Sequence, residues 1–297
     1  MDTQRLEIAR LFHRTGFGPK PGEFAEALRA GVASTRSKIL SPPSTVSYVT
    51  PPVLTDLGAR PAPNSPAVVE FSQQLRYQNQ QLFLWWLDEM VTSPHTLQEK
   101  MTWFWHGHWA TSVGKVNYAL PMFNQNVTMR KYALGNFTEF SKAMFSDGAL
   151  QVWLDGQENT VKAPNENLSR EMMELFVLGV NRYTETDVKE LARAFTGYQV
   201  SRSTGVVTYN ARRRDIAPVT VLGKTGVMTP EEVITHLVAQ NNSAQFIAER
   251  IWYRFVSSQE PLPQDHPMIK AFTGRDTYAL MKSLIESSAL SQDSIQW

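Results

Sequence analysis

Residues 164–179 read Pro-Asn-Glu-Asn-Leu-Ser-Arg-Glu-Met-Met-Glu-Leu-Phe-Val-Leu-Gly, and we call this stretch the PNEN motif. Asn165 or Asn167 can cap the start of a helix, and Gly179 can end it. Successive residues of an α-helix are rotated by about 100°, so four apolar side chains share one face: Leu168, Met172, Leu175 and Leu178. Glu171 falls within this face. The motif therefore predicts a helix over about residues 167–180 that turns one carboxylate toward the core.

Glu171 is the residue of this helix best suited to chemistry, because an ionised carboxylate is costly to bury. Such a group is paired, hydrogen-bonded, bound to a metal or protonated, and pocket carboxylates often serve in acid/base catalysis. Two interpretations follow: Glu171 reacts, or it pairs with a buried group and holds helices together. Arg170 and Glu174 lie toward the flank, where they are expected to be solvated or paired locally. Glu166 precedes the helix, where its charge complements the helix dipole.

A second candidate for chemistry is the aromatic stretch Trp103–Trp109, which contains two histidines. On a helix His108 shares a face with apolar residues, whereas His106 points almost the opposite way. Histidines at i and i+2 of a regular helix do not bind one ion, although a break at Gly107 would bring them closer. An imidazole among aromatic rings is either a hydrogen-bonded core residue or a functional group, and both interpretations stand.

His13 lies among apolar neighbours in the predicted N-terminal helix. His13, His108 and Glu171 are therefore candidate ligands for a divalent metal ion in a His-His-carboxylate site. Without a metal, the same three residues are a candidate proton-transfer set. The sequence contains no cysteine, which excludes disulfides and thiolate ligands within it. It identifies no other cofactor.

The whole sequence predicts a mainly α fold, a single multi-helix domain over residues 1–297. Further predicted helices share apolar periodicity, and they span residues 3–13, 21–30, 68–91, 94–110, 129–145, 187–195, 231–239 and 244–256. Capping boxes at Thr184–Asp187 and Thr229–Glu232 precede two of them. Residues 82–87 are apolar nearly all round and are expected at the centre of the core. Proline-rich residues 42–66 predict a surface excursion, and residues 198–221 predict one β-hairpin.

Composition indicates a folded protein, with 42% hydrophobic and 19% charged residues. The 29 basic and 28 acidic residues leave a net charge of +1, so no nucleic-acid partner is expected. No stretch approaches about eighteen apolar residues, so no membrane span is expected. The N-terminus lacks the pattern of a signal peptide, which predicts a cytoplasmic location. Phosphate-binding loops and the nucleophile elbow of α/β-hydrolases are also absent from the sequence.

These motifs resemble the bacterial family known as domain of unknown function 1800. Seven stretches carry the resemblance: 14–19 (RTGFGP), 104–109 (FWHGHW), 164–179 (the PNEN motif), 183–188 (YTETDV), 192–198 (ARAFTGY), 221–226 (VLGKTG) and 246–250 (FIAER). The resemblance implies a helical fold and, by analogy with many relatives, an exported bacterial protein, but no settled activity. Many relatives have histidine in place of Arg10, and some lack histidines in the stretch matching 104–109. Many also extend beyond the region matching residues 255–257, so a short member is expected.

Two functions of different kinds fit these residues. The first is a hydrolase-type enzyme, with Glu171, His108, Glu174 and Glu166 as catalytic candidates, acting with a metal or by acid/base chemistry. The second is a non-catalytic binding or assembly protein, in which the PNEN motif forms a structural polar network. The network residues are Asn165, Asn167, Arg170 and Glu171, and His106 is a further candidate binding residue. The sequence identifies neither a substrate nor a protein partner.

Overall fold

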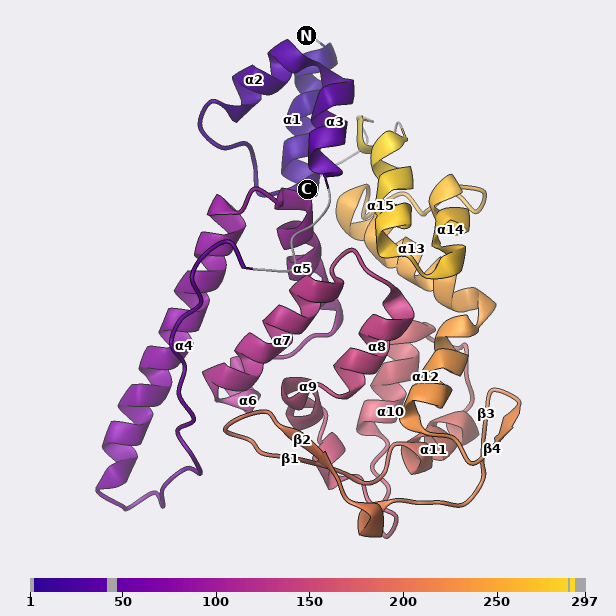
Figure 1. Ribbon diagram of the computed structural model, residues 1–297. Helices are drawn as coiled ribbons and strands as arrows, with labels where there is room; N and C mark the ends of the chain where they lie inside the picture. The colour runs from indigo at the N-terminus through magenta and orange to yellow at the C-terminus, as the bar shows by residue number, and fades with distance from the viewer. Residues whose placement is uncertain (1–2, 42–46, 288, 292–297) are drawn as a thin grey trace.

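The N-terminal helices form a small three-helix unit at one end of the molecule (Figure 1). The computed structural model describes residues 3–41, 47–287 and 289–291. Helices α1 (Thr3–Thr15) and α2 (Glu23–Ala30) confirm two predictions, whereas α3 (Val32–Ile39) was not predicted. Three buried side chains form the centre of the unit: Ile8, Phe12 and Ala27.

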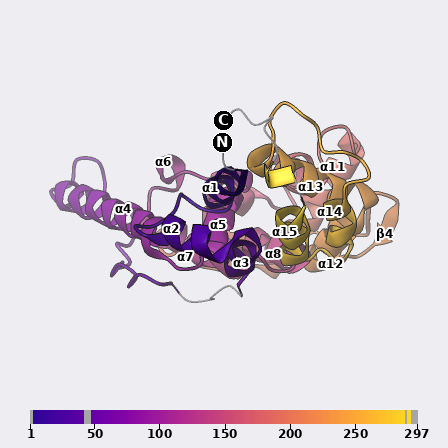
Figure 2. The same ribbon diagram turned by 90° about the horizontal axis from the view of Figure 1, so that it is seen from above.

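Two long helices follow, α4 (Ala67–Thr92) and α5 (Thr96–His108), and both confirm predictions. Residues 82–87 were expected in the centre of the core, and this expectation is wrong. Trp85 is buried, but Phe83 is 60% exposed and Leu84 45% exposed. The reason is that α4 lies at one edge of the molecule, so only one face packs on the rest of the fold (Figures 1 and 2).

The proline-rich excursion runs beside α4. Within the part that the structure describes, residues 47–66, the chain is anchored to that helix by hydrogen bonds. The Val49 amide donates to Glu89, at 3.0 Å, and the Gln78 side chain donates to Thr55, at 2.8 Å. Residues 42–46 of the predicted excursion lie outside the described residues. The connection thus wraps along α4 over residues 47–66.

The centre of the molecule contains four helices: α6 (Val113–Val116), α7 (Ala119–Tyr132), α8 (Phe137–Phe145) and α9 (Gly148–Trp153). One helix was predicted over residues 129–145, but the structure divides this stretch between α7 and α8. The division occurs at Asn136, whose side chain accepts hydrogen bonds from the Thr138 and Glu139 amides and so begins a new helix.

The PNEN motif forms a short α-helix followed by a π-helix. Helix α10 (Asn167–Glu171) continues into the π-helical segment Met172–Val177, and α11 (Glu185–Ala194) follows. Two 3-10 turns flank this region, at Gly156–Glu158 and Ala211–Arg213. The predicted capping box of Thr184 and Asp187 is present at the start of α11.

Two small antiparallel sheets replace the single predicted hairpin. Strands β1 (Tyr198–Val200) and β2 (Val207–Tyr209) pair with Gln199 opposite Thr208. Strands β3 (Val219–Val221) and β4 (Lys224–Gly226) pair with Thr220 opposite Thr225. The second hairpin was missed because Leu222, which takes a left-handed conformation in its two-residue turn, is not a residue typical of such turns.

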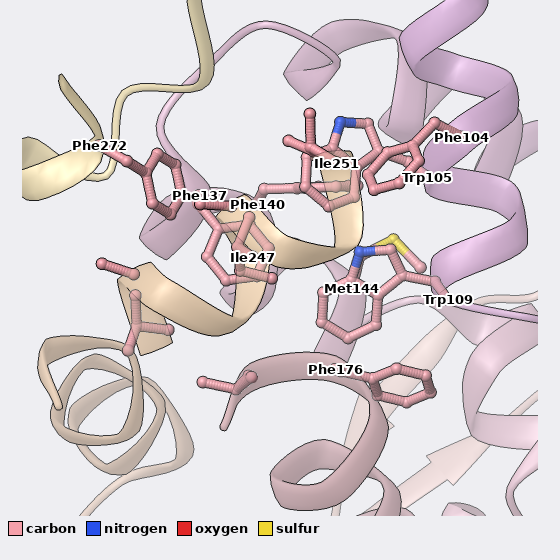
Figure 3. Close-up of a cluster of buried hydrophobic side chains, with 14 of the residues drawn as sticks. Phe104, Trp105, Trp109, Phe137, Phe140, Met144, Phe176, Ile247, Ile251 and Phe272 are labelled. Carbon is pink, nitrogen blue, oxygen red and sulfur yellow. The ribbon is translucent and has the colours of Figure 1, made fainter. Parts of the chain in front are cut away.

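The C-terminal helices close the core. They are α12 (Pro230–Ala239), α13 (Asn241–Phe255), α14 (Pro267–Ala271) and α15 (Thr277–Glu286), with 3-10 turns at Phe272–Gly274 and Ala289–Ser291. Figure 3 shows side chains of α5, α8, the π-helix and α13 packed together. One buried cluster draws residues from Leu11 to Leu290, and the described residues confirm a mainly α fold. Among them, no helix combines the length and apolarity needed to cross a membrane.

Candidate functional site

The π-helix changes which side chains of the PNEN motif face the core. Leu175 was predicted on the buried face but is 44% exposed. A π-helix places one more residue in each turn than an α-helix, so side chains after Met172 no longer follow the α-helical spacing. Glu171, which precedes this change, is half-buried.

The C-terminal end of the π-helix is fixed by three contacts. The amides of Leu178 and Gly179 both donate to the Met173 carbonyl, at 2.9 and 3.1 Å. Gly179 has φ +91°, and a Cβ there would lie 2.8 Å from the Phe246 ring. The Phe176 carbonyl accepts a hydrogen bond from His108 Nε2, at 2.9 Å. The π-helix therefore ends against α5 and α13.

The asparagines of the motif bind neighbouring loops. The Asn165 side chain accepts a hydrogen bond from the Asn167 amide, at 2.9 Å, and the Asn167 side chain donates to the Leu154 carbonyl, at 3.1 Å. Asn159 accepts from the Asn165 amide, at 2.9 Å, and donates to the Ala192 carbonyl, at 2.8 Å. Asn159 is buried and links the motif to α11. Sequence reasoning missed it, because nothing in its local pattern distinguishes it from a surface loop residue.

The charged flank of the motif pairs within the chain. Arg170 donates to both carboxylate oxygens of Glu185, at 2.7 Å each, and to Glu166, at 3.1 Å. Hydrogen bonding to Glu185 raises the pKa of Arg170, so Arg170 stays positively charged. Tyr183 donates a hydrogen bond to Glu174. The local pairing expected for Arg170 and Glu174 is therefore present.

Glu171 differs from the other motif residues. Among the described residues, its carboxylate has no hydrogen-bond or ion-pair partner. Burial raises the pKa of Glu171, the Glu174 charge raises it further, and Arg170 acts in the opposite direction. The carboxylate is thus the one group of the motif that is open to a ligand or a proton.

His108 is enclosed by aromatic rings. The rings of Trp105, Trp109 and Phe176 lie 5.3, 5.6 and 6.0 Å from its own. Burial lowers the pKa of His108 to about 3, so the imidazole is neutral at ordinary pH. Because Nε2 donates to a carbonyl, it carries the hydrogen, and Nδ1 is an acceptor with no partner among the described residues.

The other two candidate histidines, His106 and His13, lie in different surroundings. His106 lies edge-on to Trp86, with 5.0 Å between ring centroids, and burial lowers its pKa. His13 was expected among apolar side chains but is exposed on α1. Its neighbours in sequence, Phe12 and Arg14, take the buried positions. Within residues 3–41, 47–287 and 289–291, no three His, Asp or Glu side chains are placed to hold one metal ion, so His13, His108 and Glu171 do not form that site there.

A cavity of about 280 Å³ lies between α5 and α13, and we call it the α5–α13 cavity. Eight residues line it: Trp103, Phe104, His106, Gly107, His108, Arg250, Tyr253 and Arg254. The Arg254 guanidinium lies over the Trp103 ring, 4.3 Å from its centroid. Neither Arg250 nor Arg254 forms an ion pair with a described residue. Sequence reasoning missed both arginines, although their i, i+4 spacing on a helix was a usable signal.

Two buried carboxylates elsewhere have partners in the fold. Glu99 and Arg130 form a buried ion pair at 2.8 Å. Asp147 caps α9 and accepts a hydrogen bond from Gln125, at 2.6 Å, while burial raises its pKa to about 7. These groups were not predicted, because the elements that cover them are distant in sequence. They stabilise the helices of the centre rather than line the α5–α13 cavity.

Comparison with known proteins gives a family and nothing more specific. A family model described as "Protein of unknown function (DUF1800)" matches residues 10–295. The chain belongs to the DUF1800 family. No curated protein and no solved structure matches the chain.

The seven sequence stretches that carry the resemblance to DUF1800 separate into two groups in the structure. The first group comprises the stretches other than 104–109 and 246–250, and several of its polar side chains bind other parts of the fold, although Glu171 and Ser169 do not. Asp187 accepts a hydrogen bond from the Leu222 amide, at 2.7 Å, and Arg193 donates to Asp215, at 2.8 Å. The second group consists of residues 104–109 and 246–250, which meet at the α5–α13 cavity. Their polar groups at the cavity, His108 Nδ1 and Arg250, have no hydrogen-bond or ion-pair partner in the described chain.

Proposed function

We propose that this DUF1800 protein is a non-catalytic binding protein in which the PNEN motif is a structural polar network. One observation supports the proposal: four motif side chains form hydrogen bonds within the fold, namely Asn165, Asn167, Arg170 and Glu174. A hydrogen-bonded network that joins several elements stabilises one arrangement of them. The motif therefore suits a structural role.

The state of His108 supports the same proposal. A general base acts best when its pKa lies near the working pH. Burial lowers the pKa of His108 to about 3, and its Nε2 hydrogen is used by the Phe176 carbonyl. His108 is thus a weak base whose protonation is strongly disfavoured. It fits a wall of a binding cavity better than a proton acceptor.

A hydrolase-type acid/base reaction at Glu171 is the second candidate, and one observation favours it. The carboxylate is half-buried and has no partner in the described structure, and burial together with Glu174 raises its pKa. A carboxyl group in that state can donate a proton nearer neutral pH than an exposed one. The Tyr183 hydroxyl, which binds Glu174, would lie beside such a reaction.

The substitution Glu171→Gln separates the two candidates, because it removes the charge and keeps the shape. For a binding protein, we expect the free energy of unfolding in urea to change by less than about 0.5 kcal/mol, since no ion pair is lost. We also expect wild type and variant to hydrolyse para-nitrophenyl acetate no faster than buffer. Glu231→Gln, at an exposed position of α12, is the matched control.

Turnover of the ester by the wild type, lost in Glu171→Gln and kept in Glu231→Gln, would contradict the binding proposal and establish the reaction at Glu171. Circular dichroism of the three proteins checks that each one is folded.

A further inference from the structure

We propose that the α5–α13 cavity binds a small organic anion, a carboxylate carried on an aromatic body. This inference rests on the proposed function, because it supplies the ligand class of a binding protein. It draws on four features of the cavity: its charge, its aromatic walls, the glycine in its α5 wall and the unpartnered nitrogen of His108.

The charge of the cavity is positive and unbalanced. Arg250 and Arg254 are spaced i, i+4 on α13, so their side chains leave the same face of the helix. No aspartate or glutamate lines the cavity. Guanidinium groups present N–H donors in a fork that matches the two oxygens of a carboxylate. The two arginines, both exposed to solvent, therefore suit an anionic ligand.

The walls of the cavity are aromatic. Trp103, Phe104 and Tyr253 provide ring surfaces, and the Arg254 guanidinium already lies over Trp103. Arg250, Tyr253 and Arg254 are exposed, so the ring surfaces act by covering the flat body of an aromatic ligand rather than by removing the arginines from water. A bare inorganic ion would leave these rings unused. A volume of about 280 Å³ is at the small end of ligand sites and suits a single-ring molecule.

Gly107 leaves open space in the α5 wall of the cavity. It lies in the last turn of α5, where glycine is less favourable than alanine. A Cβ added at Gly107 would meet no atom within 4 Å, and its φ is not in the left-handed region. Neither packing nor backbone conformation therefore requires glycine here. Its effect is to keep the cavity unobstructed, which is consistent with close approach of a ligand.

His108 adds a neutral acceptor to the same wall. Its Nδ1 atom is buried and has no partner in the described structure. A ligand hydroxyl could satisfy this atom, whereas a second carboxylate could not, because both groups are acceptors. An aromatic hydroxy acid thus matches all of the lining groups, and para-hydroxybenzoate is a suitable probe.

Isothermal titration calorimetry with para-hydroxybenzoate tests the inference on the full chain. We expect binding by the wild type, weakened about tenfold or more in Arg250→Gln and in Arg254→Gln, because each loses a charge-assisted hydrogen bond. Arg212→Gln removes the same charge from an exposed position outside the cavity, and it should bind like the wild type. Gly107→Leu fills the cavity from a position without clashes and should abolish binding while the chain stays folded.

Three results would overturn the inference: no binding of para-hydroxybenzoate at millimolar concentration, equal binding of neutral para-hydroxybenzamide, or equal binding of inorganic phosphate. Each concerns only the α5–α13 cavity and its ligand. Failure of the proposed function would instead show as ester hydrolysis that depends on Glu171, so the two failures are distinguishable.

Discussion

At the scale of single residues, the environment of a side chain decides its chemistry more than its type does. His108 and Glu171 were predicted as reacting partners, yet they are perturbed in opposite ways. Burial keeps His108 neutral, with one nitrogen bound to a carbonyl. Burial raises the pKa of Glu171, whose carboxylate has no partner in the described structure. These differences depend on groups brought together by folding, which the helical phase of a sequence does not reveal.

The pH dependence of stability tests the state of His108. The pKa is about 3 in the fold, against an ordinary value near 6.5 in the unfolded chain. Stability from the neutral imidazole is therefore complete above about pH 6.5 and is lost as the pH falls toward 3. His108→Phe should lower the free energy of unfolding by about 1–3 kcal/mol near neutral pH, because the Phe176 carbonyl loses its donor. The difference in the free energy of unfolding between the wild type and His108→Phe should narrow as the pH falls, because only the wild type loses the contribution of the neutral imidazole.

Urea unfolding between about pH 3 and about pH 6.5 measures the free energy of unfolding of both proteins. Trp105→Phe, a neighbour that does not titrate, controls for general loss of packing. Parallel pH profiles for the wild type and His108→Phe would contradict the proposed state of His108.

At the scale of elements, the predicted helices are largely confirmed where a cap or a proline marks the start. Helices α5, α11 and α12 begin near the predicted residues, and the boxes at Thr184 and Thr229 are both present. The π-helix at Met172–Val177 was not predicted, because its local sequence also fits an α-helix. Its end is set by partners far away in sequence, which are His108 and Phe246.

Gly179 tests how this end is fixed. Its φ of +91° is strained for other residues, and a Cβ would lie 2.8 Å from the Phe246 ring. Gly179→Ala should therefore lower the free energy of unfolding by more than about 1 kcal/mol. Thermal unfolding measures the loss. Gly226→Ala is a matched control, because it has open space and no left-handed φ, and an equal effect of both substitutions would contradict this account.

At the scale of the whole molecule, segments distant in sequence supply the two candidate regions. Side chains from residues 103–108 and 250–254 line one cavity, and this pairing was not predictable because nothing local links the two segments. The fold class, the helices and the family could be recognised in the sequence, and the family model covers residues 10–295. The positions of Arg250 and Asn159 within the fold could not be predicted from the sequence, because each depends on long-range packing.

The central claim is that the PNEN motif stabilises the fold, and Asn159 is the residue that joins the motif to α11. Equilibrium unfolding of Asn159→Ala in urea tests it most directly. The substitution leaves the Asn165 amide without a partner and removes one of two donors to the Ala192 carbonyl, which keeps the Phe195 amide. We therefore predict that the free energy of unfolding falls by about 1–2 kcal/mol. Asn242→Ala, at a less buried position of α13, should change little. A free energy of unfolding equal to that of the wild type in Asn159→Ala would contradict the claim.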